Sequence, residues 1–246
     1  MKTSVEKSTL IAELQHQILQ WQGFKQIENK EHRLGLGELE KAFPGTLFPI
    51  GAIHEFISES KEEEASSSGF IGGLLSFLMQ KGGIGLWISS SSQVFAPAIN
   101  AFGVEPDRII FVQMKKQSDI LWALEEGLKC EGVGVVIAEV QDIDFVQSRR
   151  LQLAVEKSGV TGFVLRLQPR FLGATACAAR WHIRPLPSDV EEGVPGIGFP
   201  QWEVELLKVR NGNLSRWTVG WKQNQLQAKR IVSSSKDMQG DKRKVG

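Results

Sequence analysis

The sequence predicts an α/β fold built on a mainly parallel sheet with helices on both faces. Five short apolar runs carry this prediction, at residues 53–57, 84–88, 109–112, 135–137 and 163–165. The runs are continuous rather than alternating, which is typical of strands buried on both faces. Helical patterns separate them, as in successive parallel strand and helix units. We therefore expect a doubly wound domain over about 34–169, with ligands at the carboxyl ends of its strands.

An amphipathic helix is predicted before this domain, over residues 4–21. Its apolar residues recur at steps of three and four, namely Leu10, Ile11, Leu14, Ile18 and Trp21. Residues 22–33 are polar and are expected to form a linker, which makes 1–33 a separate segment. The helix could dock on its own domain, on a second copy or on another partner. A further short helix is predicted from Leu34 and closed by Pro44 and Gly45.

The connection after the first strand is expected to be a polar loop over 58–69, with the next helix beginning at Phe70. In strand, loop and helix order, this is the place of a phosphate-binding P-loop. No GxxxxGK[ST] motif is present, and glutamates stand at 62, 63 and 64. A carboxylate next to a triphosphate is repelled by about 1 kcal/mol per close pair even in water. The sequence therefore predicts a nucleotidase-shaped element without ATP or Mg²⁺ as cofactor.

The C-terminal part predicts two alternating strands, over 202–210 and 214–221, after a loop rich in Pro and Gly that follows Pro185. Asn211-Gly212-Asn213 between them is a strong hairpin signal. The core should thus extend over 34–221, and residues 222–246 are predicted to be a disordered basic tail. From 207 to 246 ten basic and two acidic residues leave an excess of eight positive charges. Beside this tail, the tryptophans of the hairpin are candidates for an interaction surface (Trp202, Trp217 and Trp221).

Composition excludes several classes of protein. The two cysteines, Cys130 and Cys177, lie far apart without a CxxC motif, so neither a disulfide framework nor a zinc site is expected. The N-terminus has no signal-peptide pattern, and no apolar run reaches the roughly 18 residues of a membrane span. We expect a cytoplasmic protein without a membrane partner. Trp87 and Trp122 lie within apolar patterns and are expected in the core.

Two segments carry a family resemblance. Residues 47–56 resemble the entry to the ATPase core of RecA-type recombinases, and 101–110 resemble the approach to the third core strand of that family. The longer run from Gly37 to about Pro185, including 121–126 and 148–154, resembles the ImuA family. That family comprises RecA-like, damage-inducible accessory proteins of error-prone DNA synthesis that are related to the SulA division inhibitors. The resemblance implies a RecA-like fold for this chain.

The resemblance also implies where a nucleotide site would lie. Ser68 matches the Walker lysine and Gly69 the residue after it, while the catalytic glutamate falls among 89–92, at Ser91. The acid ending the fourth strand is kept, and a glutamine follows the fifth. The implied vestigial site comprises Glu62, Glu63, Glu64, Ser66, Ser67, Ser68 and Gly69, with Glu139 and Gln168. Without the lysine and the general base, phosphoryl transfer cannot be assembled, so no enzyme activity is expected.

By resemblance, the protein is a non-catalytic accessory factor of DNA-damage-induced translesion synthesis in the SOS response. The implied partners are a Y-family-polymerase-like adaptor, an error-prone replicative-type polymerase, single-stranded or damaged DNA, and a second copy through the N-terminal helix. In recombinases, loops near 149–170 line the DNA channel, although a plain charged helix face is the simpler interpretation here. The basic candidates for DNA or partner binding are Arg149, Arg150, Arg170, Arg216, Lys222, Lys229, Arg230, Lys242, Arg243 and Lys244, with Lys157 and Arg166 nearby.

Two other functions stay open at this point. One is a DNA-dependent ATPase that uses an unorthodox nucleotide loop and depends on Glu139. The other is a SulA-like inhibitor that binds the tubulin-like division protein. The first predicts release of phosphate, and the second predicts filamentous cells when the protein is overproduced.

Overall fold

The computed structural model of the chain describes residues 34–80, 83–91, 96–190 and 196–231. The predicted N-terminal helix and its linker lie outside the described residues, as do residues 232–246 of the predicted basic tail. All described residues belong to one unit that begins at Leu34. The following description concerns this unit alone.

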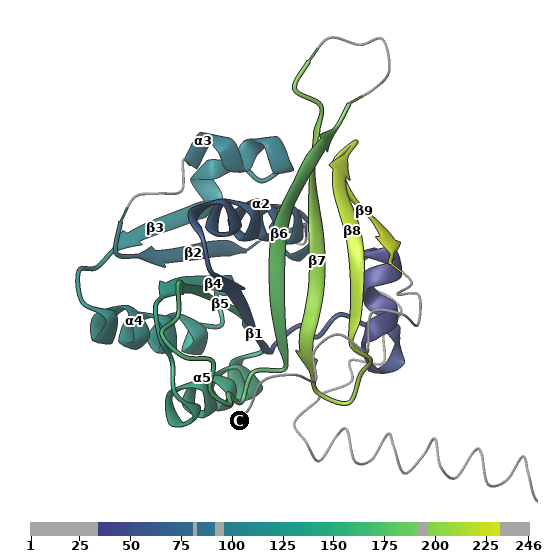
Figure 1. Cartoon of the computed structure of the whole chain (residues 1–246). Coiled ribbons are helices and arrows are strands. Elements are labelled where there is room, and N and C mark those ends of the chain that lie inside the picture. Colours follow the sequence, from purple (N-terminus) through teal and green to yellow (C-terminus); the bar gives the residue numbers. More distant parts are fainter. Residues whose placement is uncertain (1–33, 81–82, 92–95, 191–195, 232–246) are drawn as a thin grey trace, which may run out of the picture. The chain divides into compact units, whose positions relative to one another are not determined.

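The unit is built on a nine-stranded sheet in the order β3-β2-β4-β5-β1-β6-β7-β8-β9 (Figure 1). The strands are β1 (Ile53–Ser58), β2 (Ile84–Ser89), β3 (Ile109–Gln113), β4 (Val133–Val140), β5 (Thr161–Leu167), β6 (Ala179–Asp189), β7 (Phe199–Val209), β8 (Ser215–Lys222) and β9 (Gln225–Arg230). Strands β1 to β6 pair in parallel, and β7, β8 and β9 add antiparallel strands at one side. The predicted α/β class with a mostly parallel sheet is confirmed, and the arrangement is compatible with a RecA-like fold.

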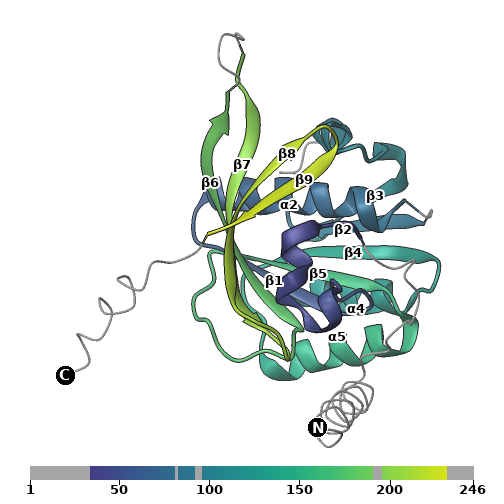
Figure 2. The ribbon, with the colours of Figure 1, turned by 90° about the vertical axis from the view of Figure 1, so that its right-hand side faces the viewer.

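Helices cover both faces of the parallel part of the sheet (Figures 1 and 2). The helices are α2 (Lys61–Leu78), α3 (Ala96–Ile99), α4 (Gln117–Lys129) and α5 (Phe145–Ser158), with short 3-10 helices η2 (Gly37–Ala42), η3 (Pro44–Thr46), η4 (Asn100–Phe102) and η5 (Pro106–Arg108). One apolar core lies on the α2 face and includes Phe56, Phe70 and Trp181. A second core lies under α4 and α5 and includes Leu124 and Val155.

The helix predicted from Leu34 is instead the pair of 3-10 helices η2 and η3. Within the described residues no helix combines the length and the apolar character that a membrane span requires.

Strand β6 was not predicted, because Pro185 and Pro187 suggested that the chain had entered a loop. Only residues 179–182 of β6 pair with β1, whereas the strand continues along β7. Both prolines therefore lie where β6 has a single neighbour. A strand with one open side tolerates a residue that has no N–H group. Trp181 and Ile183 alternate with polar residues before the prolines, and this was the available signal.

The prediction of disorder from 222 onward is wrong for its first part, since β9 lies within it. Gln223 and Asn224 form the turn from β8, with φ values of 54° and 57°. Two consecutive residues with positive φ are typical of the tight turn that joins antiparallel strands. Leu226 on β9 is buried at the α2 face, so this strand completes the core there.

Four of the five tryptophans considered in the sequence analysis differ in burial from the prediction. Trp87 is buried as predicted, but Trp122 on α4 is 62% exposed, so the prediction that it belongs to the core is wrong. The three hairpin tryptophans expected at an interaction surface are instead core residues, with exposed fractions of 5%, 1% and 5% (Trp202, Trp217 and Trp221). The alternation of β7 and β8 directs these side chains toward α2, which lies over that face of the sheet.

Candidate functional site

The connection between β1 and α2 is much shorter than predicted. It consists of Glu59 and Ser60, and the helix begins at Lys61. Ser60 is the N-cap, and its hydroxyl accepts a hydrogen bond from the Glu63 backbone N–H at 3.3 Å. The Glu63 carboxylate in turn accepts one from the Glu59 backbone N–H at 2.7 Å. The predicted loop over 58–69 is therefore wrong, because Ser60 and Glu63 form a capping arrangement that starts the helix early.

This early start removes the phosphate cradle. A P-loop binds phosphates through successive backbone N–H groups that face the ligand. Here the backbone N–H groups of Glu59 and Glu63 donate to the Glu63 carboxylate and the Ser60 hydroxyl, and the predicted loop serines belong to the helix. The hydroxyls of Ser66 and Ser68 donate to the carbonyls of Glu62 and Glu64, at 2.8 and 2.9 Å. Ser67 forms a hydrogen bond with Ser58 at 2.9 Å.

Glu64 and Gln168 meet beside the start of α2, as parts of one predicted site should. Gln168 Nε2 donates to Glu64 Oε1 at 3.0 Å, from a residue that follows β5. Lys61 Nζ donates to the other oxygen, Oε2, at 2.5 Å. Glu64 is only 6% exposed, so its charge is balanced mainly by these two neighbours.

Glu139 lies near the carboxyl end of β4 and is 5% exposed. Its Oε1 accepts a hydrogen bond from the Trp87 indole N–H at 2.8 Å. Burial raises the pKa of Glu139, the hydrogen bond from Trp87 opposes this shift, and the nearby charge of Glu64 adds to it. The acid that ends the fourth strand is therefore a buried side chain held by an indole.

These residues border a pocket of about 530 Å³, which we call the α2 pocket. It is lined by Lys61, Glu64, Ala65, Ser66, Ser68, Gly69, Ala98, Phe102, Glu139, Leu167, Pro200 and Trp202. Sequence reasoning identified the carboxylates and the serines but missed the walls from η4 and β7. No sequence signal could have found Trp202, because it reaches the pocket from a strand far along the chain.

The α2 pocket offers carboxylates and an already paired amine to a ligand. Among the described residues, no three His, Cys, Asp or Glu side chains form a group suited to a metal ion. The single lysine of the lining, Lys61, is bound to Glu64 and not directed to a phosphate. This chemistry favours a cationic or neutral ligand over a triphosphate.

The predicted basic residues do not form one surface. Arg149 and Arg150 lie on α5 and contact carboxylates, Glu156 at 3.6 Å and Glu125 at 2.6 Å. Arg170 follows β5 and contacts Asp142 at 3.1 Å. The remaining described candidates lie on β8 and β9, namely Arg216, Lys222, Lys229 and Arg230. Lys242, Arg243 and Lys244 lie outside the described residues.

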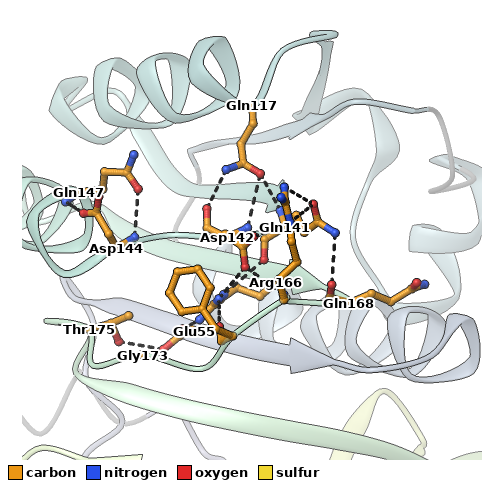
Figure 3. Close-up of polar contacts among 12 residues, drawn as sticks. Glu55, Gln117, Gln141, Asp142, Asp144, Gln147, Arg166, Gln168, Gly173 and Thr175 are labelled. Atoms are coloured by element: carbon orange, nitrogen blue, oxygen red, sulfur yellow. Dashed lines mark hydrogen bonds and ion pairs between the residues drawn. The ribbon is translucent and has the colours of Figure 1, made fainter.

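Arg166, which had been grouped with these residues, is fully buried and is not available to DNA. It donates to Glu55 at 3.0 Å and to Asp142 at 3.2 Å (Figure 3). The second oxygen of Glu55 accepts hydrogen bonds from Arg180 at 2.7 Å and from Thr175 at 2.9 Å. Arg166 also donates to the carbonyl of Phe171. This buried network fastens the segment between β5 and β6 to the sheet.

Comparison with known proteins gives a clear relationship over most of the chain. No family model matches. Protein ImuA of Caulobacter vibrioides, from strain NA1000 / CB15N and from strain ATCC 19089 / CIP 103742 / CB 15, is 34% identical over 198 residues. The match covers 75% of this chain and 81% of each relative. The chain therefore belongs to the ImuA family.

Proposed function

We propose that this protein is a non-catalytic accessory factor of damage-induced mutagenesis that recruits or scaffolds an error-prone polymerase complex. Membership in the ImuA family supports the process. One structural observation carries the non-catalytic part: only two residues separate β1 from α2, and the first turn of α2 is closed by the chain's own Ser60 and Glu63. Neither ATP nor Mg²⁺ is a cofactor in this proposal.

Phosphoryl transfer depends on a cation at the phosphates, a metal ion and an oriented nucleophile. The position matched to the Walker lysine is Ser68, whose hydroxyl is bound within the helix. One carboxylate oxygen of Glu139 is bound to the Trp87 indole, so only the other oxygen is open to a metal ion. Both features argue against the alternative of a working ATPase.

A scaffolding role needs a surface for partners, and α4 and α5 provide one. Trp122, Val146 and Leu153 are 62%, 67% and 50% exposed. Trp122 borders a pocket of about 230 Å³ and Leu153 one of about 390 Å³, and both pockets share Glu125 and Arg150. Exposed tryptophan and arginine side chains are enriched where protein partners bind most tightly. We call this the α4–α5 surface and assign it to a protein of the polymerase complex, by resemblance the Y-family-like adaptor.

The test measures mutation frequency after DNA damage in cells that lack the gene. Wild type should restore induced mutagenesis, whereas a Trp122→Ala, Leu153→Ala double variant should leave it near the undamaged level. Leu214→Ala is the matched control, because Leu214 is 63% exposed but lies between β7 and β8. Leu214→Ala should restore induced mutagenesis as wild type does, and the comparison is made with the control and the double variant at equal protein levels.

Deletion without any effect on induced mutagenesis would overturn the proposal. Filamentation on overproduction, with mutagenesis unchanged, would favour the division inhibitor instead. Release of phosphate from ATP in the presence of DNA, lost in Glu139→Gln, would favour the ATPase.

A further inference from the structure

The α2 pocket has the opposite charge preference to the nucleotide site whose place it takes. Two carboxylates line the pocket, from Glu64 and Glu139, and three further glutamates stand at 59, 62 and 63 around the start of α2. The lysine among them, Lys61, is bound to Glu64 at 2.5 Å. The carboxylates at this rim attract a cation, whereas they repel a polyphosphate.

One carboxylate oxygen in the pocket lacks a donor. Trp87 donates to Glu139 Oε1, but within the described part of the chain Glu139 Oε2 accepts no hydrogen bond. Glu139 is only 5% exposed, and it lines the pocket. Oε2 is therefore open to a ligand in the pocket, and an N–H group of a cationic ligand would form a charge-assisted hydrogen bond with it. This observation is independent of the number of acidic residues nearby.

The remaining walls define the shape of such a ligand. Phe102 and Trp202 contact each other with ring centroids 6.3 Å apart, and Leu167 and Pro200 extend the apolar lining. A hydrated metal ion gains nothing from these walls. A guanidinium group on an aliphatic stem suits both parts of the pocket, because its plane stacks on aromatic rings and its N–H groups bind carboxylates in pairs.

We propose that the α2 pocket binds an arginine side chain presented by a partner protein, with the guanidinium group donating to Glu139 Oε2 and approaching Glu64. The pocket volume of about 530 Å³ also leaves room for the residues beside that arginine. The site thus recognises a basic peptide segment where a nucleotide would bind in an ATPase.

The probe is the peptide acetyl-Gly-Arg-Gly-amide, added to the full-length protein. Binding is followed by the indole N–H resonances of Trp87 and Trp202, which contact or line the pocket. The arginine peptide should shift both resonances in a saturable way. The same peptide with citrulline, which has the shape of arginine without its charge, should not, and neither should ATP.

Glu139→Gln should weaken binding about tenfold or more, since it replaces a charge-assisted hydrogen bond by a neutral one. Glu64→Gln is a second variant should the first unfold, and it is also expected to weaken binding. Glu126→Gln on the exposed side of α4 is the control and should bind as wild type. The assay contains neither DNA nor polymerase, so its outcome does not depend on the function proposed above.

Two results would overturn the inference. One is equal binding of the arginine and citrulline peptides, which would show that charge is not recognised. The other is the absence of any shift with the arginine peptide, or unchanged affinity in folded Glu139→Gln and Glu64→Gln.

Discussion

At the scale of the residue, His54 shows how the core holds a polar ring in its neutral form. The side chain is completely buried in β1. Its Nε2 contacts the Pro49 carbonyl at 2.7 Å, and its Nδ1 accepts a hydrogen bond from the Trp181 indole at 3.3 Å. Nε2–H is therefore the donor to Pro49, so both ring nitrogens are satisfied without a charge. Burial lowers the pKa of His54 from 6.5 to about 4, although the hydrogen bond to Pro49 opposes the shift.

This pKa predicts a loss of stability in acid. The contribution of His54 is fully present above pH 6.5, where both states are neutral, and it is lost as pH falls toward about 4. In that interval the unfolded chain takes up the proton first, and the integrated loss approaches about 3 kcal/mol. Urea unfolding across this range should show a smaller acid loss in His54→Gln than in wild type. Equal losses in the two proteins would contradict the assignment.

At the scale of the element, α2 contains glycines where helices usually avoid them. A Cβ atom at Gly72 would lie 2.7 Å from the ring of Phe102, and one at Gly73 would lie 2.9 Å from Leu226. The glycines therefore allow η4 and β9 to pack against the helix. This close approach offsets the roughly 1 kcal/mol by which each glycine disfavours a helix relative to alanine.

Gly72→Ala should accordingly destabilise the protein, although alanine is the better helix former. We expect the free energy of unfolding to fall by about 1–3 kcal/mol, because the Phe102 ring must move. Ser76→Ala on the same helix is the control and should change it by less than about 0.5 kcal/mol. Denaturant unfolding of the two variants measures the difference. If Gly72→Ala were as stable as wild type, the Phe102 ring would move aside without lowering the free energy of unfolding.

At the scale of the whole unit, the network around Arg166 joins β1, β5, β6 and the segment after β4. Arg166 and Glu55 are both fully buried at 3.0 Å. Removing one member of a buried ion pair leaves the other charge uncompensated, which costs about 3–5 kcal/mol. Glu55 keeps its contact with Arg180, so Arg166→Met should lower the free energy of unfolding by about 3 kcal/mol, the lower end of this range, as measured in urea.

The matched control is Arg170→Met, which removes an arginine from the same carboxylate, Asp142, at a side chain that is 73% exposed. Exposed pairs contribute about 0–1 kcal/mol, so this change should be small. Adding Glu55→Met to Arg166→Met should lower the free energy of unfolding further, since Arg180 then loses its carboxylate partner. If the two single arginine variants were equally stable, the network would not hold the sheet together.

Features that depend on local pattern could be predicted from the amino-acid sequence. Continuous apolar runs predicted five parallel strands, and Asn211-Gly212 predicted the turn between β7 and β8. The missing Walker motif was also a property of the sequence. The family resemblance implied that Glu64, Glu139 and Gln168 belong to one site, and Gln168 does contact Glu64 while Glu139 lines the same pocket as Glu64.

The other features could not be predicted from local pattern, because burial and pairing depend on residues far apart in the chain. Strand β6 tolerates its prolines because β1 has already ended beside it. Trp202 forms a wall of the pocket while Trp122 faces solvent, although both lie in apolar patterns. Arg166 is buried because Glu55 and Asp142, distant in sequence, neutralise it. A local pattern indicates which secondary structure a segment favours, whereas the residues that pack against the segment determine which of its faces is buried.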